Sequence, residues 1–395
     1  MKLRATSLGV VCGSLLLLLA RADAAPRDFT SEARTVYAVA ACGEPAPAPH
    51  DGQVIAAHCK ELAKTVGLWR SKWFAKASPF FGKLLAKGYP STVVYPFGGG
   101  DVVTMLAVYP DATDYTSMSL EGIGDPRPIR ELGGKAKPRL AGELGKLRKL
   151  LVGNLGWAWN TTIQLSIESS ESGAGIPNIL AIAMVALEAH GYEPLEARYF
   201  DLDADGSLTY LTQERIDAWD ADPANLVTAR AKRKKTHDLQ HGIFNNIEIV
   251  FRKKGDASAP KKTFRHIAAD LSDAGVDKHA GAIAYIGRKQ SLAAITKAAS
   301  YLLWDADFDK LRTMLLARMK LMVSDDTGIP PRHAKPAGFT QVVFGTYLGA
   351  FFKFADDDVE KEMVELWRGA AEKTLGFPFG YYDNRRNPHV MFTYK

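Results

Sequence analysis

The sequence predicts an α/β fold with a mainly parallel, mixed sheet flanked by helices, Rossmann-like in outline and with a β-hairpin insertion. Two patterns predict it: a strand, glycine turn, helix and strand over residues 92–120, and a second strand–helix–strand pattern over residues 300–323. Short apolar runs that alternate with helical segments are typical of parallel sheets. Two strand-like segments around a turn at residues 196–211 predict the hairpin. Apolar residues make up 47% of the 395-residue chain, which is enough for a substantial core.

The first 24 residues have the pattern of an export signal. Lys2 and Arg4 precede an apolar run from Leu8 to Ala20, and residues 22–24 place small side chains where a signal peptidase cleaves. The run is shorter than the roughly 20 residues of a membrane-spanning helix. It therefore predicts a removable signal peptide (residues 1–24), with no transmembrane segment after its removal. We expect an exported protein, periplasmic or secreted, that works where ATP, NAD and S-adenosylmethionine are scarce.

Residues 25–395 are expected to form a single α/β domain with insertions, because no linker is long enough to force a boundary. The alternative is two domains divided near residue 220. Cys42 and Cys59 are the cysteines that remain after signal removal. Exported chains with a small, even number of cysteines usually pair them, so we predict a disulfide between these two. It would fasten a loop rich in proline and alanine to the helix that begins near Val54.

The individual elements follow from local patterns. Residues 25–35 are polar and are predicted to be frayed. Residues 54–85 carry apolar side chains on one side, which predicts a helix that Pro79 breaks. Strands are expected at 92–95, 115–120, 196–200, 207–211, 247–252, 263–267, 300–304, 321–323 and, at a sheet edge, 390–394. Further helices are expected at 102–108, 127–160, 178–189, 307–318 and 359–373.

The glycine turn after the first strand is a candidate ligand site, and it consists of Gly98, Gly99, Gly100 and Asp101. In open α/β sheets, ligands bind at the carboxyl ends of strands, where a helix N-terminus offers unpaired N–H groups. Glu121 would end the next strand, where an acidic residue commonly receives ribose hydroxyls. This looks like the first motif of nucleotide-binding folds such as S-adenosylmethionine-dependent methyltransferases, although the G-G-G-D order departs from theirs. A structural turn with Asp101 as helix N-cap fits equally well.

A pair of adjacent carboxylates, Asp325 and Asp326, follows the apolar run at 321–323. Such a pair can bind a cation, act as an acid–base pair or cap the next turn, and these alternatives stay open. If both strand–helix–strand patterns belong to one parallel sheet, the pair lies at the same edge as the glycine turn. We therefore predict one acidic ligand site formed by Gly98, Gly99, Gly100, Asp101, Glu121, Asp325 and Asp326.

A third motif begins at Asp201 and matches the opening of a calcium loop. Asp201, Asp203 and Asp205 stand at positions one, three and five, and Gly206 stands at position six. Position twelve, which should be a bidentate Glu, is Thr212. The flanks are strand-like, so a hairpin turn without metal is the favoured interpretation and calcium is the alternative. No other cofactor is expected.

Two classes of function stay open. The formal net charge of +6 is a mild excess, and the basic run at 230–235 has no interleaved aromatic residues, so we expect no nucleic-acid partner. The first class is a binding or interaction module for an unknown small molecule or envelope component. The second is an enzyme that uses the carboxylates, with or without a divalent cation, on an envelope or extracellular substrate. No complete nucleophile–base set can be assembled, so binding is favoured.

Four segments, taken in order, resemble an uncharacterised family of exported bacterial proteins. They are YPFGGGD (95–101), NTTIQ (160–164), KAASYLLW (297–304) and SDDTGIP (324–330). No activity, ligand or fold is attached to that family, so the resemblance assigns no role to any residue. It implies only that these segments belong together in one architecture.

Overall fold

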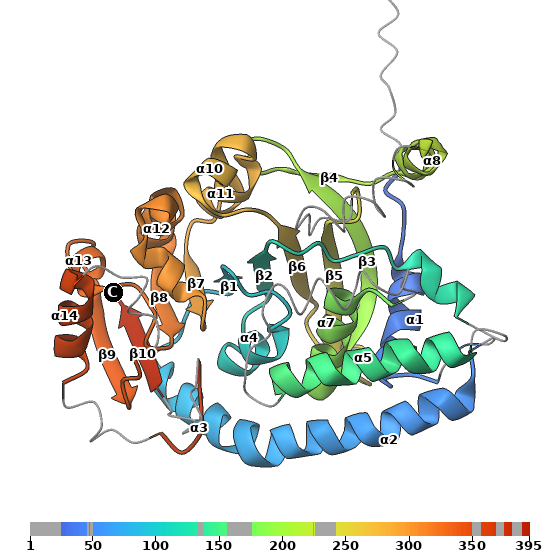
Figure 1. Cartoon of the computed structure of the whole chain (residues 1–395), viewed down its shortest axis with the longest axis horizontal. Helices are drawn as coiled ribbons and strands as arrows, with labels where there is room; N and C mark the ends of the chain where they lie inside the picture. Colours follow the sequence, from blue (N-terminus) through green and yellow to red (C-terminus); the bar gives the residue numbers. More distant parts are fainter. Residues whose placement is uncertain are drawn as a thin grey trace, which may run out of the picture.

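The computed structural model describes residues 25–45, 47, 50–132, 137–155, 176–223, 225, 242–349, 357–368, 375–380 and 389–395. The predicted signal peptide, the basic run at 230–235 and the NTTIQ segment lie outside these residues. In the described part, ten strands form one mixed sheet flanked by helices (Figure 1). This confirms the predicted fold class.

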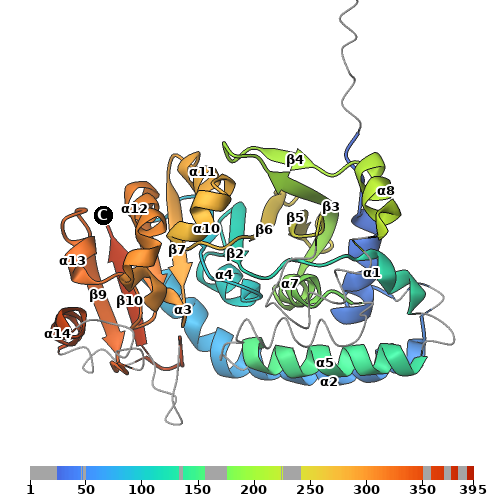
Figure 2. The ribbon, with the colours of Figure 1, turned by 45° about the horizontal axis from the view of Figure 1, so that its top comes forward.

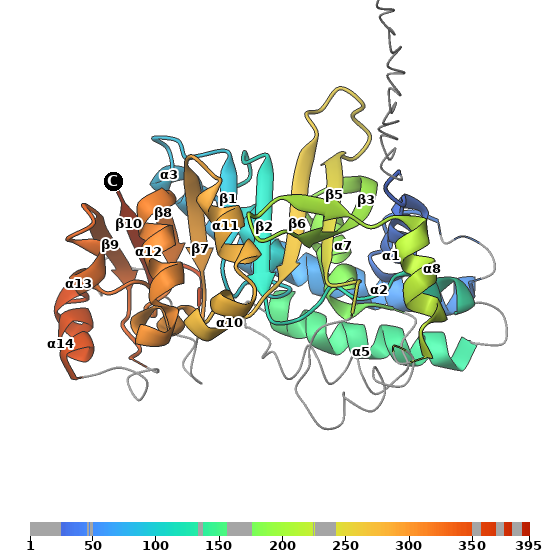
Figure 3. The same cartoon turned by 90° about the horizontal axis from the view of Figure 1, so that it is seen from above.

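The strands lie in the order β4-β3-β5-β6-β2-β1-β7-β8-β10-β9, and Figure 3 shows most of them in a row. Neighbouring central strands β6, β2, β1, β7 and β8 run parallel, and antiparallel strands extend both sides of this centre. The bounds are β1 (Thr92–Tyr95), β2 (Asp114–Ser119), β3 (Tyr192–Leu202), β4 (Leu208–Tyr210), β5 (Asn246–Lys253), β6 (Lys262–Ala268), β7 (Leu292–Thr296), β8 (Met319–Ser324), β9 (Thr340–Gly345) and β10 (His389–Tyr394).

Helices cover both faces of the sheet (Figures 1 and 2). The larger core lies under α1 (Thr30–Ala40), α2 (Gly52–Leu68), α3 (Ala75–Leu84), α4 (Val102–Val108), α5 (Lys137–Leu155) and α7 (Asn178–Ala189). The opposite core lies under α11 (Gly281–Gly287), α12 (Asp309–Arg318) and α13 (Pro331–Ala334), with α10 (Asp273–Lys278) beside α12. A third cluster joins α14 (Asp357–Leu366) to β9 and β10. The remaining described elements are α8 (Gln213–Ala221) and four short helices, η1 (Trp69–Phe74), η2 (Arg127–Glu131), η4 (Ser300–Trp304) and η5 (Ala306–Phe308).

Four predictions about individual elements were wrong. Residues 25–35 include the start of α1, because the helix continues through an apolar stretch that it buries. Pro79 does not break the helix but lies inside α3, and the helical geometry is irregular before it, at the π-helix η1. Residues 300–304 form the 3₁₀ helix η4, and the strand of this unit is β7, at residues 292–296. Residues 390–394 belong to β10, which lies between β8 and β9 and not at the edge.

A topological switch point lies between β1 and β7. From β1 the chain passes through α4 to β2, whereas from β7 it passes through α12 to β8, on the other side. The two crossover helices pack on opposite faces of the sheet. In open α/β sheets, the crevice at the carboxyl ends of two such neighbouring strands is the usual place for a ligand.

The predicted disulfide forms between Cys42 and Cys59, whose Cα atoms are 5.7 Å apart. It joins the end of α1 to α2, and His58 beside it hydrogen-bonds the carbonyl oxygen of Ala40 at 2.9 Å. None of the described helices is long and apolar enough to cross a membrane.

Candidate functional site at the strand ends

Asp101 and Lys297 form a buried ion pair at the switch point. Asp101 follows β1 at the start of α4, and Lys297 directly follows β7. The Lys297 Nζ atom lies 2.6 Å from Asp101 Oδ2, and the lysine side chain is only 4% exposed. The Tyr95 hydroxyl donates to Asp101 Oδ2 at 2.9 Å, and the Thr104 hydroxyl donates to Oδ1 at 2.7 Å. One ammonium and two hydroxyls therefore balance the charge of Asp101.

The glycines before Asp101 form a tight turn against β2. The Gly98 N–H donates to Met118 O at 2.9 Å, and the Ser117 hydroxyl donates to Gly99 O at 3.0 Å. A Cβ on Gly98 would lie 2.7 Å from Ser117 Oγ, and Gly99 has a φ of +47°. Packing and backbone conformation thus explain these two glycines. Asp101 stands at the N-cap position of α4, but its carboxylate caps no helix N–H.

Asp325 directly follows β8, and the turn after β7 holds its carboxylate. Its Oδ2 accepts the Ala298 N–H at 2.6 Å, and its Oδ1 accepts the hydroxyls of Ser300 at 3.2 Å and Thr327 at 2.5 Å. Ala298 has a φ of +64°, a strained conformation for a residue with a Cβ. A Cβ on Gly380 would lie 2.2 Å from Asp325 Cβ, so Gly380 packs closely against Asp325. These contacts fix the orientation of Asp325.

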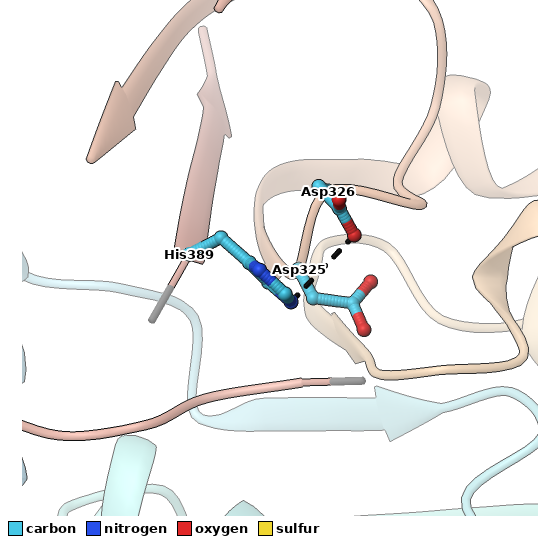
Figure 4. A group of neighbouring side chains, drawn as sticks. All are labelled: Asp325, Asp326 and His389. Atoms are coloured by element: carbon cyan, nitrogen blue, oxygen red, sulfur yellow. Dashed lines mark ion pairs between the residues drawn. The ribbon is translucent and has the colours of Figure 1, made fainter. Parts of the chain in front are cut away.

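Asp326 and His389 face each other beside Asp325 (Figure 4). Asp326 is 1% exposed and His389 is 0% exposed. Asp326 Oδ2 accepts the N–H groups of Leu348 at 2.8 Å and Gly349 at 3.1 Å. Asp326 Oδ1 lies 3.6 Å from His389 Nε2, which is longer than a hydrogen bond. Neither this oxygen nor either ring nitrogen of His389 has a hydrogen-bond partner in the described part of the chain.

The register of β10 explains why His389 reaches this place. Met391 pairs with Ser324, the last residue of β8, in an antiparallel ladder. The same register continued by two residues sets His389 opposite Asp326. The histidine thus comes from the last strand in sequence, while the carboxylates come from the turn after β8.

Burial dominates the electrostatics of the site. It raises the pKa of Asp326, and neighbouring Asp325 adds to the rise, while His389 and the two backbone N–H groups oppose it. Burial also raises the pKa of Tyr95 well above its ordinary value, and both Asp101 and Asp325 contribute. Tyr95 therefore lies within electrostatic reach of both carboxylates. We call Asp101, Lys297, Asp325, Asp326 and His389 the strand-end site.

Glu121 lies apart from the strand-end site. It follows β2, three strand positions from β8, which corresponds to about 14 Å at the usual strand spacing. Its backbone oxygen lies 2.7 Å from His266 Nε2, and both residues are buried. Glu121 Oε2 and His266 Nδ1 have no hydrogen-bond partner among the described residues. Glu121 is thus separated from Asp325 and Asp326, whereas Asp101 is linked to Asp325 through the consecutive residues Lys297 and Ala298.

The three carboxylates of the calcium-like motif contact different partners in the turn between β3 and β4. Asp201 pairs with Arg215, Asp203 accepts the Thr209 hydroxyl, and Asp205 pairs with Arg288 and accepts Ser207. The turn is also pressed against α11, since a Cβ on Gly206 would lie 2.3 Å from Tyr285 N. The turn joins two antiparallel strands, which is the hairpin that the sequence predicts.

Asp325, Asp326 and His389 could together hold a metal ion. Within the residues that the structure describes, they are the one group of three or more acidic, histidine or cysteine side chains whose ligand atoms lie within 4.8 Å of one another. Both carboxylates were predicted from the sequence, but His389 was not. Only the register of β10, which begins 63 residues after Asp326, brings the histidine to them.

No protein-family model matches this chain, and no curated protein sequence matches it. The resemblance to exported bacterial proteins therefore stays a prediction, and the function must be argued from the site itself.

Proposed function

We propose that this protein is an exported binding protein whose strand-end site takes a divalent cation. The observation that carries the proposal is the pair formed by Asp326 Oδ1 and the His389 ring. Both are fully buried, they face each other at 3.6 Å, and neither has a hydrogen-bond partner in the described part of the chain. A buried polar atom without a partner costs about 1–3 kcal/mol, and a charged one costs more. A bound cation would satisfy these atoms.

The charges of the site favour a cation over an anion. Asp325 and Asp326 bring two carboxylates to one buried place, and Lys297 is engaged by Asp101. Buried charges in proteins are usually paired or bound to metals. The position at the switch point of the sheet adds support, because ligands of open α/β sheets gather there. The export part of the proposal rests on the signal-like residues 1–24 and on the disulfide, which is typical of oxidising compartments.

The enzyme alternative would use the cation as a Lewis acid on an envelope or extracellular substrate. The Ser300 and Thr327 hydroxyls both contact Asp325, and neither is hydrogen-bonded to His389. Ser300 and Thr327 therefore form no relay through His389 to a carboxylate. Binding is the simpler function for this arrangement.

The test is thermal unfolding of the mature, chelator-treated protein with Mg²⁺, Ca²⁺, Mn²⁺ or Zn²⁺ added in turn. We expect at least one ion to raise the melting temperature, since an ion at 100 times its Kd stabilises the folded state by about 2.7 kcal/mol. Asp326→Asn should abolish the rise, and Asp203→Asn in the hairpin turn should preserve it. If Asp203→Asn abolishes the rise in melting temperature and Asp326→Asn preserves it, the ion binds at the hairpin turn and not at the strand-end site. No rise with any ion would refute the proposal.

A further inference from the structure

We infer that the cation of the strand-end site is a transition-metal ion of the zinc class, bound directly by the imidazole of His389. This inference rests on the proposed function and narrows it. Ca²⁺ and Mg²⁺ prefer oxygen ligands, whereas imidazole suits Zn²⁺ and its transition-metal neighbours. A buried imidazole without a hydrogen-bond partner, next to two carboxylates, is a mixed nitrogen and oxygen ligand set.

The separation of the ligand atoms fits such an ion. Asp326 Oδ1 and His389 Nε2 are 3.6 Å apart. Two ligands of a tetrahedral zinc ion, each about 2.1 Å from the metal, lie about 3.4 Å apart. Figure 4 shows the imidazole directed toward the two carboxyl groups. A small movement of either side chain would let one ion contact both atoms.

The surroundings hold the carboxylates in the way that metal sites require. Asp326 keeps Oδ1 available because its other oxygen accepts two backbone N–H groups, from Leu348 and Gly349. Asp325 is oriented by Ala298 and by the hydroxyls of Ser300 and Thr327. Hydrogen bonds of this kind fix the side chains that bind a metal, and their removal usually weakens metal binding 10–100-fold. Asp326 and His389 are therefore the direct ligands, and Asp325 completes the group as a third.

An ion pair without metal is the competing explanation. A protonated His389 beside an ionised Asp326 would also place opposite charges 3.6 Å apart. At this distance the pair makes no hydrogen bond, so Asp326 Oδ1 and His389 Nε2 would both stay without a hydrogen-bond partner in the described part of the chain. A metal ion between them would bind both atoms directly. His389 Nδ1 has no partner among the described residues in either case, so the choice between the two explanations rests on the experiment.

The experiment compares metals on the full mature chain. Calorimetric titrations with Zn²⁺, Co²⁺, Mg²⁺ and Ca²⁺ are made on the wild type, on His389→Gln and on His266→Gln. His266 is a matched control, since it is also 0% exposed and has an unpartnered Nδ1 in the described part of the chain. We expect Zn²⁺ to bind more than about 100-fold tighter than Ca²⁺ or Mg²⁺ and His389→Gln to weaken Zn²⁺ binding by at least about 100-fold. His266→Gln should change it less than about threefold.

A second measurement needs no variant and protects the test if His389→Gln fails to fold. Co²⁺ bound to the wild type should give a visible spectrum of a nitrogen-ligated ion, and Zn²⁺ should shift the ¹⁵N resonances of one histidine ring. Equal binding of Zn²⁺ and Ca²⁺, or unshifted histidine resonances on saturation, would overturn the inference and leave the proposed function intact. Binding of none of the ions would overturn both.

Discussion

The ion pair between Asp101 and Lys297 shows how single residues define the strand-end site. The Lys297 side chain is 4% exposed and that of Asp101 is 13% exposed, so each charge depends largely on the other to offset its lost hydration. Asp101 is further held by the Tyr95 and Thr104 hydroxyls. The pair links the ends of β1 and β7 and therefore fixes the turn from which Ala298 and Ser300 reach Asp325.

Replacing Lys297 by Met should destabilise the protein by about 3–5 kcal/mol, because Asp101 would remain as an uncompensated buried charge. The measurement is urea unfolding followed by circular dichroism. Lys361→Met is the matched control, since Lys361 pairs with Asp358 at 3.3 Å on the exposed surface and should change stability by less than about 1 kcal/mol. Adding Asp101→Asn to Lys297→Met should restore part of the loss. Equal, small effects of both lysine variants would contradict this account.

The site could be predicted from the sequence only where its residues follow strands that the sequence reveals. Asp101, Asp325 and Asp326 each come directly after a predicted strand or its glycine turn, and the structure brings them near one another. Glu121 also follows a strand, but strand order, which the sequence does not encode locally, separates it from Asp325 and Asp326. His389 was not predictable, because its place depends on the register of two strands distant in sequence.

At the level of elements, strands and helices were predicted correctly where the residue types and their spacing are those typical of the element. The β1–α4–β2 unit was predicted with bounds close to those observed, because its strands are rich in β-branched and aromatic residues. The strand β7 was missed because its sequence, LAAIT, contains two alanines, which are poor strand formers. A strand was predicted instead at the apolar residues 300–304. These residues form the 3₁₀ helix η4, and its Trp304 belongs to the cluster beside β10.

The disulfide between α1 and α2 should contribute about 3 kcal/mol to stability, because it closes a loop with a sequence separation of 17. Reduction of the folded protein, or the double variant Cys42→Ser and Cys59→Ser, should lower the free energy of unfolding by this amount. Urea unfolding with and without dithiothreitol measures it. The double variant should not respond to dithiothreitol. A change below about 1 kcal/mol would show that the contacts around His58 hold the two helices together without the bond.

For the molecule as a whole, three buried histidines predict how stability depends on pH. The pKa of His58, His190 and His266 is lowered in each case chiefly by burial, for His190 to about 4. The His190 ring packs against Trp69 and Phe74. An unfolded histidine takes up a proton near pH 6.5. Between pH 6.5 and 4 the unfolded state therefore binds more protons than the folded state, and stability falls as the pH falls.

We expect the free energy of unfolding to be several kcal/mol lower at pH 5 than at pH 7.5, with about 2 kcal/mol of the difference due to His190. Urea unfolding at the two pH values measures the difference. His190→Gln keeps a side-chain N–H for the contact with Val103 O, observed at 3.0 Å, but cannot take up a proton. In this variant the difference should shrink by about 2 kcal/mol. An unchanged difference would show that His190 titrates normally in the folded protein.

The last of the described strands, β10, lies between β8 and β9, both of which are synthesised before it. Until residues 389–394 arrive, β8 has an unsatisfied row of backbone groups along one side, and β9 has no partner among the described strands. Such open edges invite pairing with other chains. A copy that lacks these residues, whether through proteolysis or interrupted synthesis, would therefore lose the pairing of both β8 and β9. It would expose unpaired strand edges in an otherwise complete sheet. Such incomplete copies are expected to aggregate or to be degraded.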